Sequence, residues 1–252
     1  MLNTHTCGGV VLNERWILTA AHCRPNDDTK LLGVGSGDSL REVFLKGRNK
    51  VKRFVIHPMY VQNRPEHDIA LIELETDLTL ADSLQPACLP AHDYELESRQ
   101  NLLLIAGFGD IRSRLMFSDR KEKDDGDRNT AHPPPSVSDL AGISTNRLKE
   151  LYMFRSPQAA STCANGQVLC MEAVEGGKGE FTLGQGDSGS PLMLTLKGQT
   201  VVIGVDSSTR TVNNFLHNLQ LHSGSLNYFT SVFHNIDFIR RHLNEQDLCL
   251  SK

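Results

Sequence analysis

The segment GQGDSGSP, residues 184–191, contains the side chains of this sequence best suited to chemistry. Ser188 follows an aspartate and lies between Gly186 and Gly189. Glycines let the backbone approach a bound carbonyl closely and adopt turns that other residues resist. Such a turn presents a serine hydroxyl as a nucleophile, with the N–H groups of Gly186 and Ser188 aimed at a developing oxyanion. The segment predicts acyl-transfer chemistry; a glycine-rich surface turn is the alternative.

Two upstream segments supply the groups that a serine nucleophile needs. His22 lies in LTAAHC, residues 18–23, and Asp68 lies in EHDIALIEL, residues 66–74. A serine hydroxyl is a poor nucleophile until a base removes its proton. In this arrangement His22 takes that proton and returns it to the leaving amine, while Asp68 orients the imidazole and stabilises its cation. His22, Asp68 and Ser188 are therefore the predicted catalytic residues.

Short strand-like runs bounded by turn residues recur along the chain and indicate an all-β sandwich or barrel. They occur at Val10–Leu12, Val43–Leu45, Val51–Ile56, Ile69–Leu74, Leu102–Ala106, Pro191–Leu196, Val201–Val205 and Tyr228–Phe233. Near the end of the chain, Ile236, Ile239 and Leu243 have the spacing of an amphipathic helix. Asn235 is the predicted N-cap of that helix.

The composition is that of a globular chain of one large or two small domains. The 252 residues are 39% hydrophobic and 22% charged, and the formal net charge is −4. This balance argues against nonspecific binding to nucleic acid or to an anionic membrane. No stretch approaches the roughly 18 consecutive apolar residues of a membrane-spanning helix. We therefore expect neither nucleic acid nor a membrane as a partner.

The three motifs, in the order histidine, aspartate, serine, resemble those of the chymotrypsin/trypsin-type (S1) serine proteases, over nearly the whole chain. The resemblance implies two packed antiparallel six-stranded β-barrels, the first of them incomplete, with the triad in the cleft between them and a C-terminal α-helix. It implies one peptidase domain at 1–246, comprising an N-terminal barrel at about 1–95, a C-terminal barrel at about 100–233 and a helix at about 235–246.

The activity implied by this resemblance is that of a serine endopeptidase, which forms an acyl-enzyme on Ser188 and needs no metal or organic cofactor. Its implied partners are protein or peptide substrates and protein protease inhibitors, and the chain would be a monomer. The alternative is a catalytically silent homologue that binds a protein through its cleft and loops. The complete triad favours the enzyme. Ser190 in place of the family's second glycine favours the silent homologue, as does Gly184 in place of the cysteine that usually bridges the nucleophile loop.

The six cysteines are an even set, which suits a secreted, disulfide-bonded protein. The family's bridges imply two pairs, and the two cysteines that remain form the third. The expected disulfides are Cys7–Cys23, Cys163–Cys170 and Cys88–Cys249.

The primary substrate pocket is implied less clearly. Thr182, six residues before the nucleophile, falls at the base of the family's pocket, and Ser207 and Thr209 fall on its other wall. Ser207 would also bond to Asp68, and the Thr209 side chain would narrow an entrance that the family keeps open with glycine. These residues predict a small or medium uncharged substrate side chain before the scissile bond. Entry of Glu180 into the pocket is the alternative.

Two further features concern activation and the surface. Family members begin with an Ile-Val-Gly-Gly-like sequence whose freed amine pairs with the aspartate before the nucleophile, here Asp187. Residues 1–6 contain no such sequence and no signal segment. Either the sequence is truncated, which we favour, or this mode of activation has been lost. A buried aspartate that lacks its ion-pair partner lowers the stability of the fold. A polar insertion at about 110–140 is predicted to be a surface loop beside the cleft.

Overall fold

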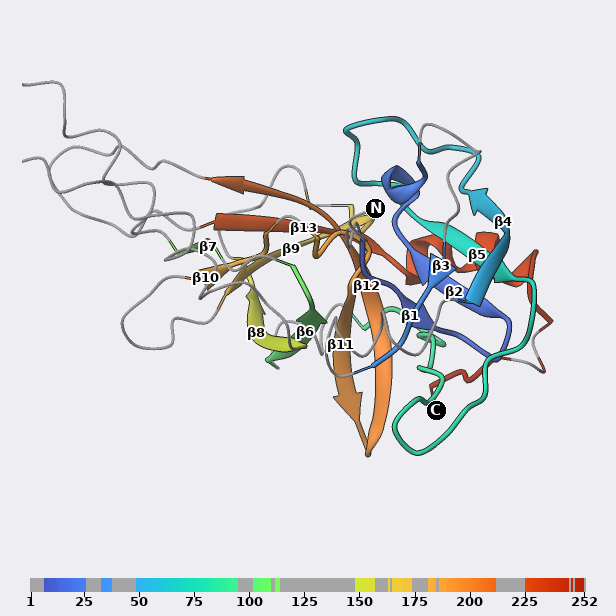
Figure 1. The fold of residues 1–252 in the computed structure, drawn as a ribbon. Coiled ribbons are helices and arrows are strands. Elements are labelled where there is room, and N and C mark those ends of the chain that lie inside the picture. Colours follow the sequence, from blue (N-terminus) through green and yellow to red (C-terminus); the bar gives the residue numbers. More distant parts are fainter. Residues whose placement is uncertain are drawn as a thin grey trace, which may run out of the picture.

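A computed structural model describes the chain in thirteen stretches: residues 7–25, 33–37, 49–94, 102–109, 112–113, 148–156, 163, 165–173, 181–184, 186–211, 225–244, 246 and 248–251. These residues form two antiparallel β-structures side by side, with a short helix near the C-terminus (Figure 1). Residues 1–6, the strand predicted at Val43–Leu45, Glu180 and nearly all of the polar insertion lie outside the described residues.

The first structure is an open, curled sheet of five strands. Its order is β1 (Val10–Val11), β2 (Trp16–Thr19), β5 (Ala70–Leu74), β4 (Asn49–Ile56) and β3 (Gly33–Val34). The two central strands β2 and β5 are almost wholly buried. Their near-continuous apolar sequences, WILT and ALIEL, are typical of strands covered on both faces.

The second structure is a closed barrel of six strands. Around the barrel these are β11 (Pro191–Leu196), β12 (Gln199–Thr211), β13 (Ser225–Ser231), β9 (Val168–Ala173), β8 (Lys149–Arg155) and β6 (Leu103–Gly107). Alternate residues point inward: Leu103, Ile105 and Met153 are buried, whereas Tyr152 and Phe154 are exposed. A separate ribbon pairs β7 (Arg112–Ser113) with β10 (Phe181–Thr182).

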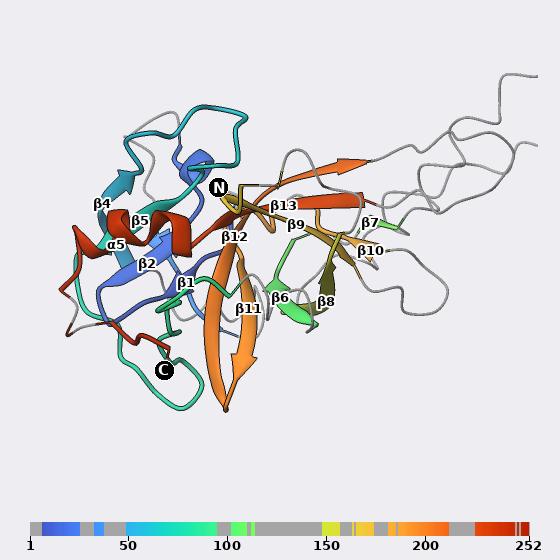
Figure 2. The same cartoon turned by 180° about the vertical axis from the view of Figure 1, so that it is seen from behind.

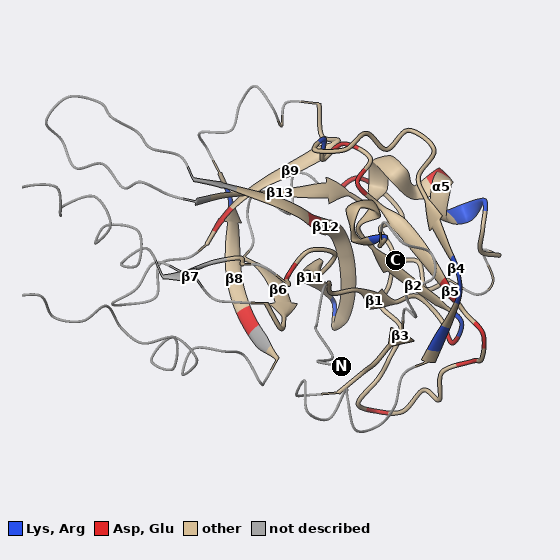
Figure 3. Ribbon diagram, turned by 45° about the horizontal axis from the view of Figure 1, so that its top comes forward, with Lys and Arg blue, Asp and Glu red and all other residues tan. Residues whose placement is uncertain are grey.

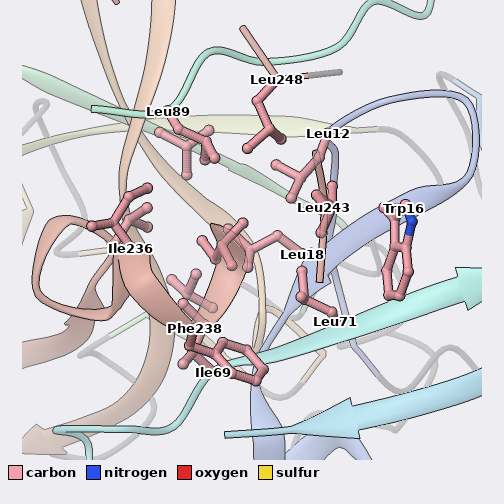
Figure 4. Close-up of a cluster of buried hydrophobic side chains, with 14 of the residues drawn as sticks. Leu12, Trp16, Leu18, Ile69, Leu71, Leu89, Ile236, Phe238, Leu243 and Leu248 are labelled. Carbon is pink, nitrogen blue, oxygen red and sulfur yellow. The ribbon is translucent and has the colours of Figure 1, made fainter. Parts of the chain in front are cut away.

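The two halves share one hydrophobic core, and this core fixes their relative position. Leu18 and Leu71 from the first sheet pack in one cluster with Val205 of β12 and with Phe238 and Ile239 near the C-terminus (Figure 4). The helix α5 (Ile236–Arg240) lies over the first sheet (Figure 2). The buried side chains of α5 belong to this shared cluster. The C-terminal part of the chain therefore covers the first sheet, which is formed by the N-terminal part.

The C-terminal helix differs from the expectation. It spans Ile236–Arg240 after a 3-10 turn at Phe233–Asn235, and is therefore shorter than the expected range of about 235–246. Asn235 occupies the N-cap position, as predicted, but its side chain makes no capping hydrogen bond. The backbone is already helical at Val232, and the buried amide instead donates to the carbonyl oxygens of Glu66 (3.2 Å) and Ser231 (2.8 Å).

The fold class expected from the sequence is confirmed: the protein is mostly β, with a trypsin-like pair of β-structures and one short helix. The second barrel has the expected six strands. The first is open, with five strands among the described residues, as expected for an incomplete barrel.

Covalent and ionic links reinforce this arrangement. Three disulfides are present, and their pairs are those expected: Cys7–Cys23, Cys88–Cys249 and Cys163–Cys170. On the outer part of the first sheet, Lys52 of β4 lies 2.7 Å from Glu73 of β5, and Arg53 also pairs with Glu73. Figure 3 shows blue segments, which are basic residues, on β4 beside β5. The Lys52 and Arg53 bonds hold the pKa of the Glu73 carboxyl below its usual value, against the effect of burial.

The shared core makes a stability prediction. Leu71→Ala should lower the free energy of unfolding by about 2–5 kcal/mol, because it leaves a cavity at a residue that is 0% exposed. Leu102→Ala is the matched control, since Leu102 is 58% exposed and its truncation should cost no more than about 0.5 kcal/mol. Denaturant unfolding with the disulfides intact measures both. Equal losses would mean that Leu71 does not lie in a tightly packed core.

Candidate active site

His22 and Asp68 are brought together by the pairing of two strands. His22 lies in a 3-10 turn, Ala21–Cys23, just after β2, and Asp68 lies two residues before β5. Thr19 of β2 pairs with Ala70 of β5, so the end of one strand meets the beginning of the other. The register of the central strands therefore sets the separation of these two side chains.

The Asp68 carboxylate accepts three hydrogen bonds from groups on both halves of the molecule. The His22 backbone N–H donates to Oδ1 at 2.9 Å, and His22 Nδ1 lies 2.6 Å from Oδ2. The Ser207 hydroxyl of β12 donates to Oδ2 at 2.6 Å. A carboxylate at Nδ1 favours the tautomer whose proton is on that nitrogen, which leaves Nε2 free to act as a base. The arrangement is that of a base oriented by an acid.

The nucleophile segment forms a tight turn against the first sheet. Ser190 N–H donates to Asp187 O at 2.9 Å within the turn, and Gly8 N–H donates to Ser188 O at 2.8 Å from outside it. Gly189 has a φ of +83°, and a Cβ there would lie 2.4 Å from Thr19 Oγ1. Both the backbone angle and the lack of space require glycine at 189.

The backbone of Ser188 lies close to Cys23, the residue that follows His22. Cys23 Sγ is 3.7 Å from the Ser188 carbonyl oxygen. Within the part of the chain that the structure describes, no hydrogen bond joins His22 to the Ser188 hydroxyl. In proteins without a bound substrate, catalytic hydrogen bonds are often longer and tighten when the substrate arrives.

Asp187 is anchored by backbone amides that the sequence did not reveal. Gly109 N–H donates to its Oδ1 at 2.8 Å, and Gly184 N–H donates to its Oδ2 at 2.9 Å. A Cβ at position 109 would lie 2.3 Å from the Asp187 carboxyl carbon. The loop that follows β6 can therefore come this close to Asp187 only because residue 109 is a glycine. The Asp187 carboxylate is thus held by two backbone amides, one from the loop that follows β6 and one from the segment just before the nucleophile.

Asp206 is a buried acidic residue of the site that sequence reasoning missed. It is 3% exposed, and its Oδ1 has no hydrogen-bond partner. Burial raises the pKa of this carboxyl well above its usual value, and the negative charges of Asp187 and Asp68 raise it further. The signal was available in the sequence: Asp206 ends the apolar run VVIGV of β12, where a charged residue is unusual.

The expected pocket residues fall in different places. Thr182 lies in β10, where its backbone pairs with Arg112, outside the closed barrel. Ser207 bonds to Asp68, as described above. Thr209 lies two residues further along β12 and donates its hydroxyl to Asn227 Oδ1 at 2.9 Å. Asn227 is fully buried and also donates to Met171 O at 3.3 Å; the sequence analysis did not single it out.

Two histidines pack together beside the loop that carries Asp68. The rings of His57 and His67 are stacked, with centroids 4.6 Å apart, and Phe238 meets His57 edge-on. Burial, followed by the nearby charges of His67 and Arg241, lowers the pKa of His57 to about 4. His57 is therefore neutral near pH 7 and acts as a packing side chain.

One group of side chains has the donor set of a metal site. The ligand atoms of Cys7, His22 and Cys23 lie within 4.8 Å of one another. The two sulfurs are joined in a disulfide, and a metal ligand must be a thiolate. This group therefore does not fit a metal ion.

None of the helices in the described residues is long and apolar enough to span a membrane.

Comparisons with known proteins agree with this geometry. The trypsin family model matches residues 1–124. Complement C1r-A subcomponent of Mus musculus is 39% identical over 123 residues, 44% of this chain and 17% of that protein. Venom serine protease Bi-VSP of Bombus ignitus is 29% identical over 218 residues, 80% of this chain and 51% of that protein. Trypsin 5G1 of Aedes aegypti is 29% identical over 192 residues, 76% of this chain and 62% of that protein.

The fold, the family match and these relatives are together those of a trypsin-like serine protease domain. The chain is similar to the trypsin (S1) family. It spans less than two thirds of the length of these three relatives. Its disulfides and its similarity to venom and complement proteases indicate an extracellular protein.

The buried carboxyl of Asp206 makes a pH prediction. Because its folded-state pKa is raised, the folded protein binds this proton more tightly than the unfolded chain does. The free energy of unfolding should then fall as the pH rises from about 4, the unfolded value, up through the raised pKa. Asp206→Asn removes this pH-dependent contribution to the free energy of unfolding. The stability of the variant relative to the parent protein should therefore increase as the pH rises. Denaturant midpoints at pH 5 and pH 8 measure this, and parallel changes in both proteins would contradict it.

Proposed function

We propose that this protein is a serine endopeptidase that cleaves peptide bonds through an acyl-enzyme on Ser188. The observation that supports it best is the hydrogen-bonded series Ser207–Asp68–His22, located beside a glycine turn that carries a serine. Similarity to the trypsin family supports the same activity.

The proposed reaction uses the three side chains in succession. His22 Nε2 takes the proton of Ser188 Oγ as that oxygen bonds to the substrate carbonyl carbon. The N–H groups of Gly186 and Ser188 stabilise the oxyanion, and His22 then gives the proton to the leaving amine. A water molecule, activated by His22 in the same way, hydrolyses the ester and restores the Ser188 hydroxyl. Asp68 holds the imidazole in place and stabilises its cation throughout.

The substrate is proposed to add to the open edge of β12. This strand pairs with β11 only as far as Val205, while its pairing with β13 continues to Thr211. The edge from Ser207 to Thr209 is therefore available to an extended peptide, which would pair with it through main-chain hydrogen bonds. Ser207 and Thr209 are proposed substrate-binding residues, and Thr182 of β10 is a third.

The organisation and setting of the enzyme are part of the proposal. Residues 1–246 form a single peptidase domain, with barrels at about 1–95 and 100–233 followed by the helix α5 at Ile236–Arg240. The protein is secreted and acts as a monomer on proteins or peptides, and protein protease inhibitors bind to its cleft. Asp187 holds the oxyanion-binding turn in place, as supported by its bonds from Gly109 and Gly184.

A fluorophosphonate probe tests the catalytic assignment. The probe should label the folded chain at Ser188, because only an activated serine hydroxyl attacks its phosphorus. Ser188→Ala should abolish the labelling, and Asp68→Asn should lower the turnover of peptide substrates by roughly 10⁴-fold, because it favours the wrong tautomer of His22. Asp237→Asn, which changes an exposed aspartate of α5, is the control and should have no effect.

Labelling that persists in Ser188→Ala would overturn the assignment of the nucleophile. A folded chain that neither reacts with the probe nor cleaves any peptide would instead support the silent, protein-binding homologue.

A further inference from the structure

The loop that leads into β5, residues 65–68, ends at Asp68 and is bonded to a side chain of the closed barrel. The hydroxyl of Thr230, on β13, donates to Pro65 O at 2.7 Å and to Asp68 O at 3.1 Å. Thr230 is 0% exposed, so water does not compete for these bonds. A buried carbonyl group that loses its donor destabilises the arrangement that buries it. The Thr230 hydroxyl therefore restrains both ends of this loop.

The Asn235 side chain bonds to the two residues in the middle of the same loop. Its amide donates to Glu66 O at 3.2 Å and to Ser231 O at 2.8 Å. Its Oδ1 lies 2.8 Å from Nδ1 of His67, and a carboxamide oxygen can only accept, so the imidazole donates. Asn235 is 2% exposed. Each of the four residues of the loop is therefore bonded to one of these two buried side chains.

Two neighbouring strands of the barrel hold the two ends of Asp68. Thr230 bonds to its main-chain carbonyl, and Ser207 bonds to its carboxylate. Thr230 of β13 lies opposite Val205 of β12, and Ser207 follows Val205 by two residues on the same strand. The remaining contacts of the carboxylate come from His22, next to the first sheet. The position of Asp68 relative to His22 therefore depends on Thr230 as well as on Ser207.

The chain just before this loop offers little apolar packing that could hold it in place. Met59 is 64% exposed and Val61 is 58% exposed. The ring of His67 stacks on that of His57, and Asn235 binds its edge. Polar contacts with the C-terminal part of the chain are therefore the main restraint on this side of the loop.

We infer that Thr230 and Asn235 are positioning residues, which hold the loop of Asp68 so that its carboxylate stays in contact with His22. This inference rests on the proposed protease function and adds two residues to the machinery of that site. Within the described residues neither side chain bonds to His22, and neither lies on the strand edge proposed to bind the substrate. Both therefore act through Asp68. A displacement of about 1 Å in a catalytic group can lower a rate on the order of 10²-fold.

Thr230→Val tests the inference, because it removes the hydroxyl and nearly keeps the shape of the side chain. With a fluorogenic peptide that the wild type cleaves, kcat should fall roughly 10- to 10²-fold while KM stays within about twofold. Thr230→Ser, which keeps the hydroxyl, should recover most of the rate. Asn235→Ala is the second variant and should also lower kcat.

Tyr94→Phe is the matched control. It removes another buried hydroxyl bond, from Tyr94 to Ser251 Oγ at 2.7 Å, in which no residue of the site takes part. This variant should keep the wild-type kcat. A fall of the same size in Tyr94→Phe would overturn the inference, because a general loss of stability would then explain the effect of Thr230→Val.

A proton NMR measurement in the Ser188→Ala protein needs no catalysis. The His22 Nδ1 proton lies in a 2.6 Å contact with Asp68, and the proton of such a short, charge-assisted bond resonates far downfield. Adding Thr230→Val or Asn235→Ala should move this signal upfield or broaden it by exchange, whereas adding Tyr94→Phe should leave it in place.

An unchanged kcat and an unchanged signal in folded Thr230→Val and Asn235→Ala would overturn the inference. Equal losses of kcat in Thr230→Val and Thr230→Ser would do the same for Thr230, since the hydroxyl would then not matter. A wild type without peptidase activity would contradict the proposed function, and the proton signal in Ser188→Ala would then decide the inference by itself.

Discussion

The hydrogen bonds on the Asp68 carboxylate are the interaction on which the site depends. They come from His22, at the end of a strand of the first sheet, and from Ser207, on a strand of the closed barrel. A change in the relative position of the two halves would therefore break a contact at the oriented base. The shared hydrophobic core, in which Val205 of the barrel packs with Leu18 and Leu71 of the sheet, prevents such a change. In the proposed reaction the core therefore positions the catalytic side chains, although none of its own side chains takes part in the chemistry.

The nucleophile turn is held in part by glycines whose positions leave no space for a larger residue. Gly8 donates to the Ser188 carbonyl, and a Cβ on Gly8 would lie 2.2 Å from Ser190 Oγ. Gly109 donates to the Asp187 carboxylate and is equally confined. The positions of the backbone N–H groups are therefore set by packing before any substrate arrives. Such preorganised donors are effective in stabilising a developing negative charge, because they need no rearrangement during the reaction.

The sequence was enough to predict the fold class, the three cysteine pairs and the contact of His22 with Asp68, because each of these has a local motif or a known family pattern. The role of Ser188 as the nucleophile stays a prediction. The sequence was not enough for features that depend on long-range register. The bonds from Gly109 to Asp187 and from Thr209 to Asn227 join segments far apart in the chain, and no local pattern shows which residues will meet. Asn235 does occupy the predicted N-cap position, but its side chain donates to the carbonyl oxygens of Glu66 and Ser231 instead of capping the helix, and the bond to Glu66 is another contact between distant segments. Asp206 was overlooked although its apolar neighbours in β12 indicate burial, because the sequence does not reveal that its carboxyl lacks a partner.

The Cys88–Cys249 disulfide has a topological consequence. It joins residues 161 positions apart, and Leu89 and Leu250 beside it pair as an isolated bridge. The whole closed barrel, the nucleophile turn and the C-terminal helix therefore lie inside a single covalent loop. One backbone cut anywhere between Cys88 and Cys249 opens this loop without separating the molecule into two pieces. A chain nicked once in this region would gain only the mass of one water, and its two fragments would stay joined until a reducing agent released them.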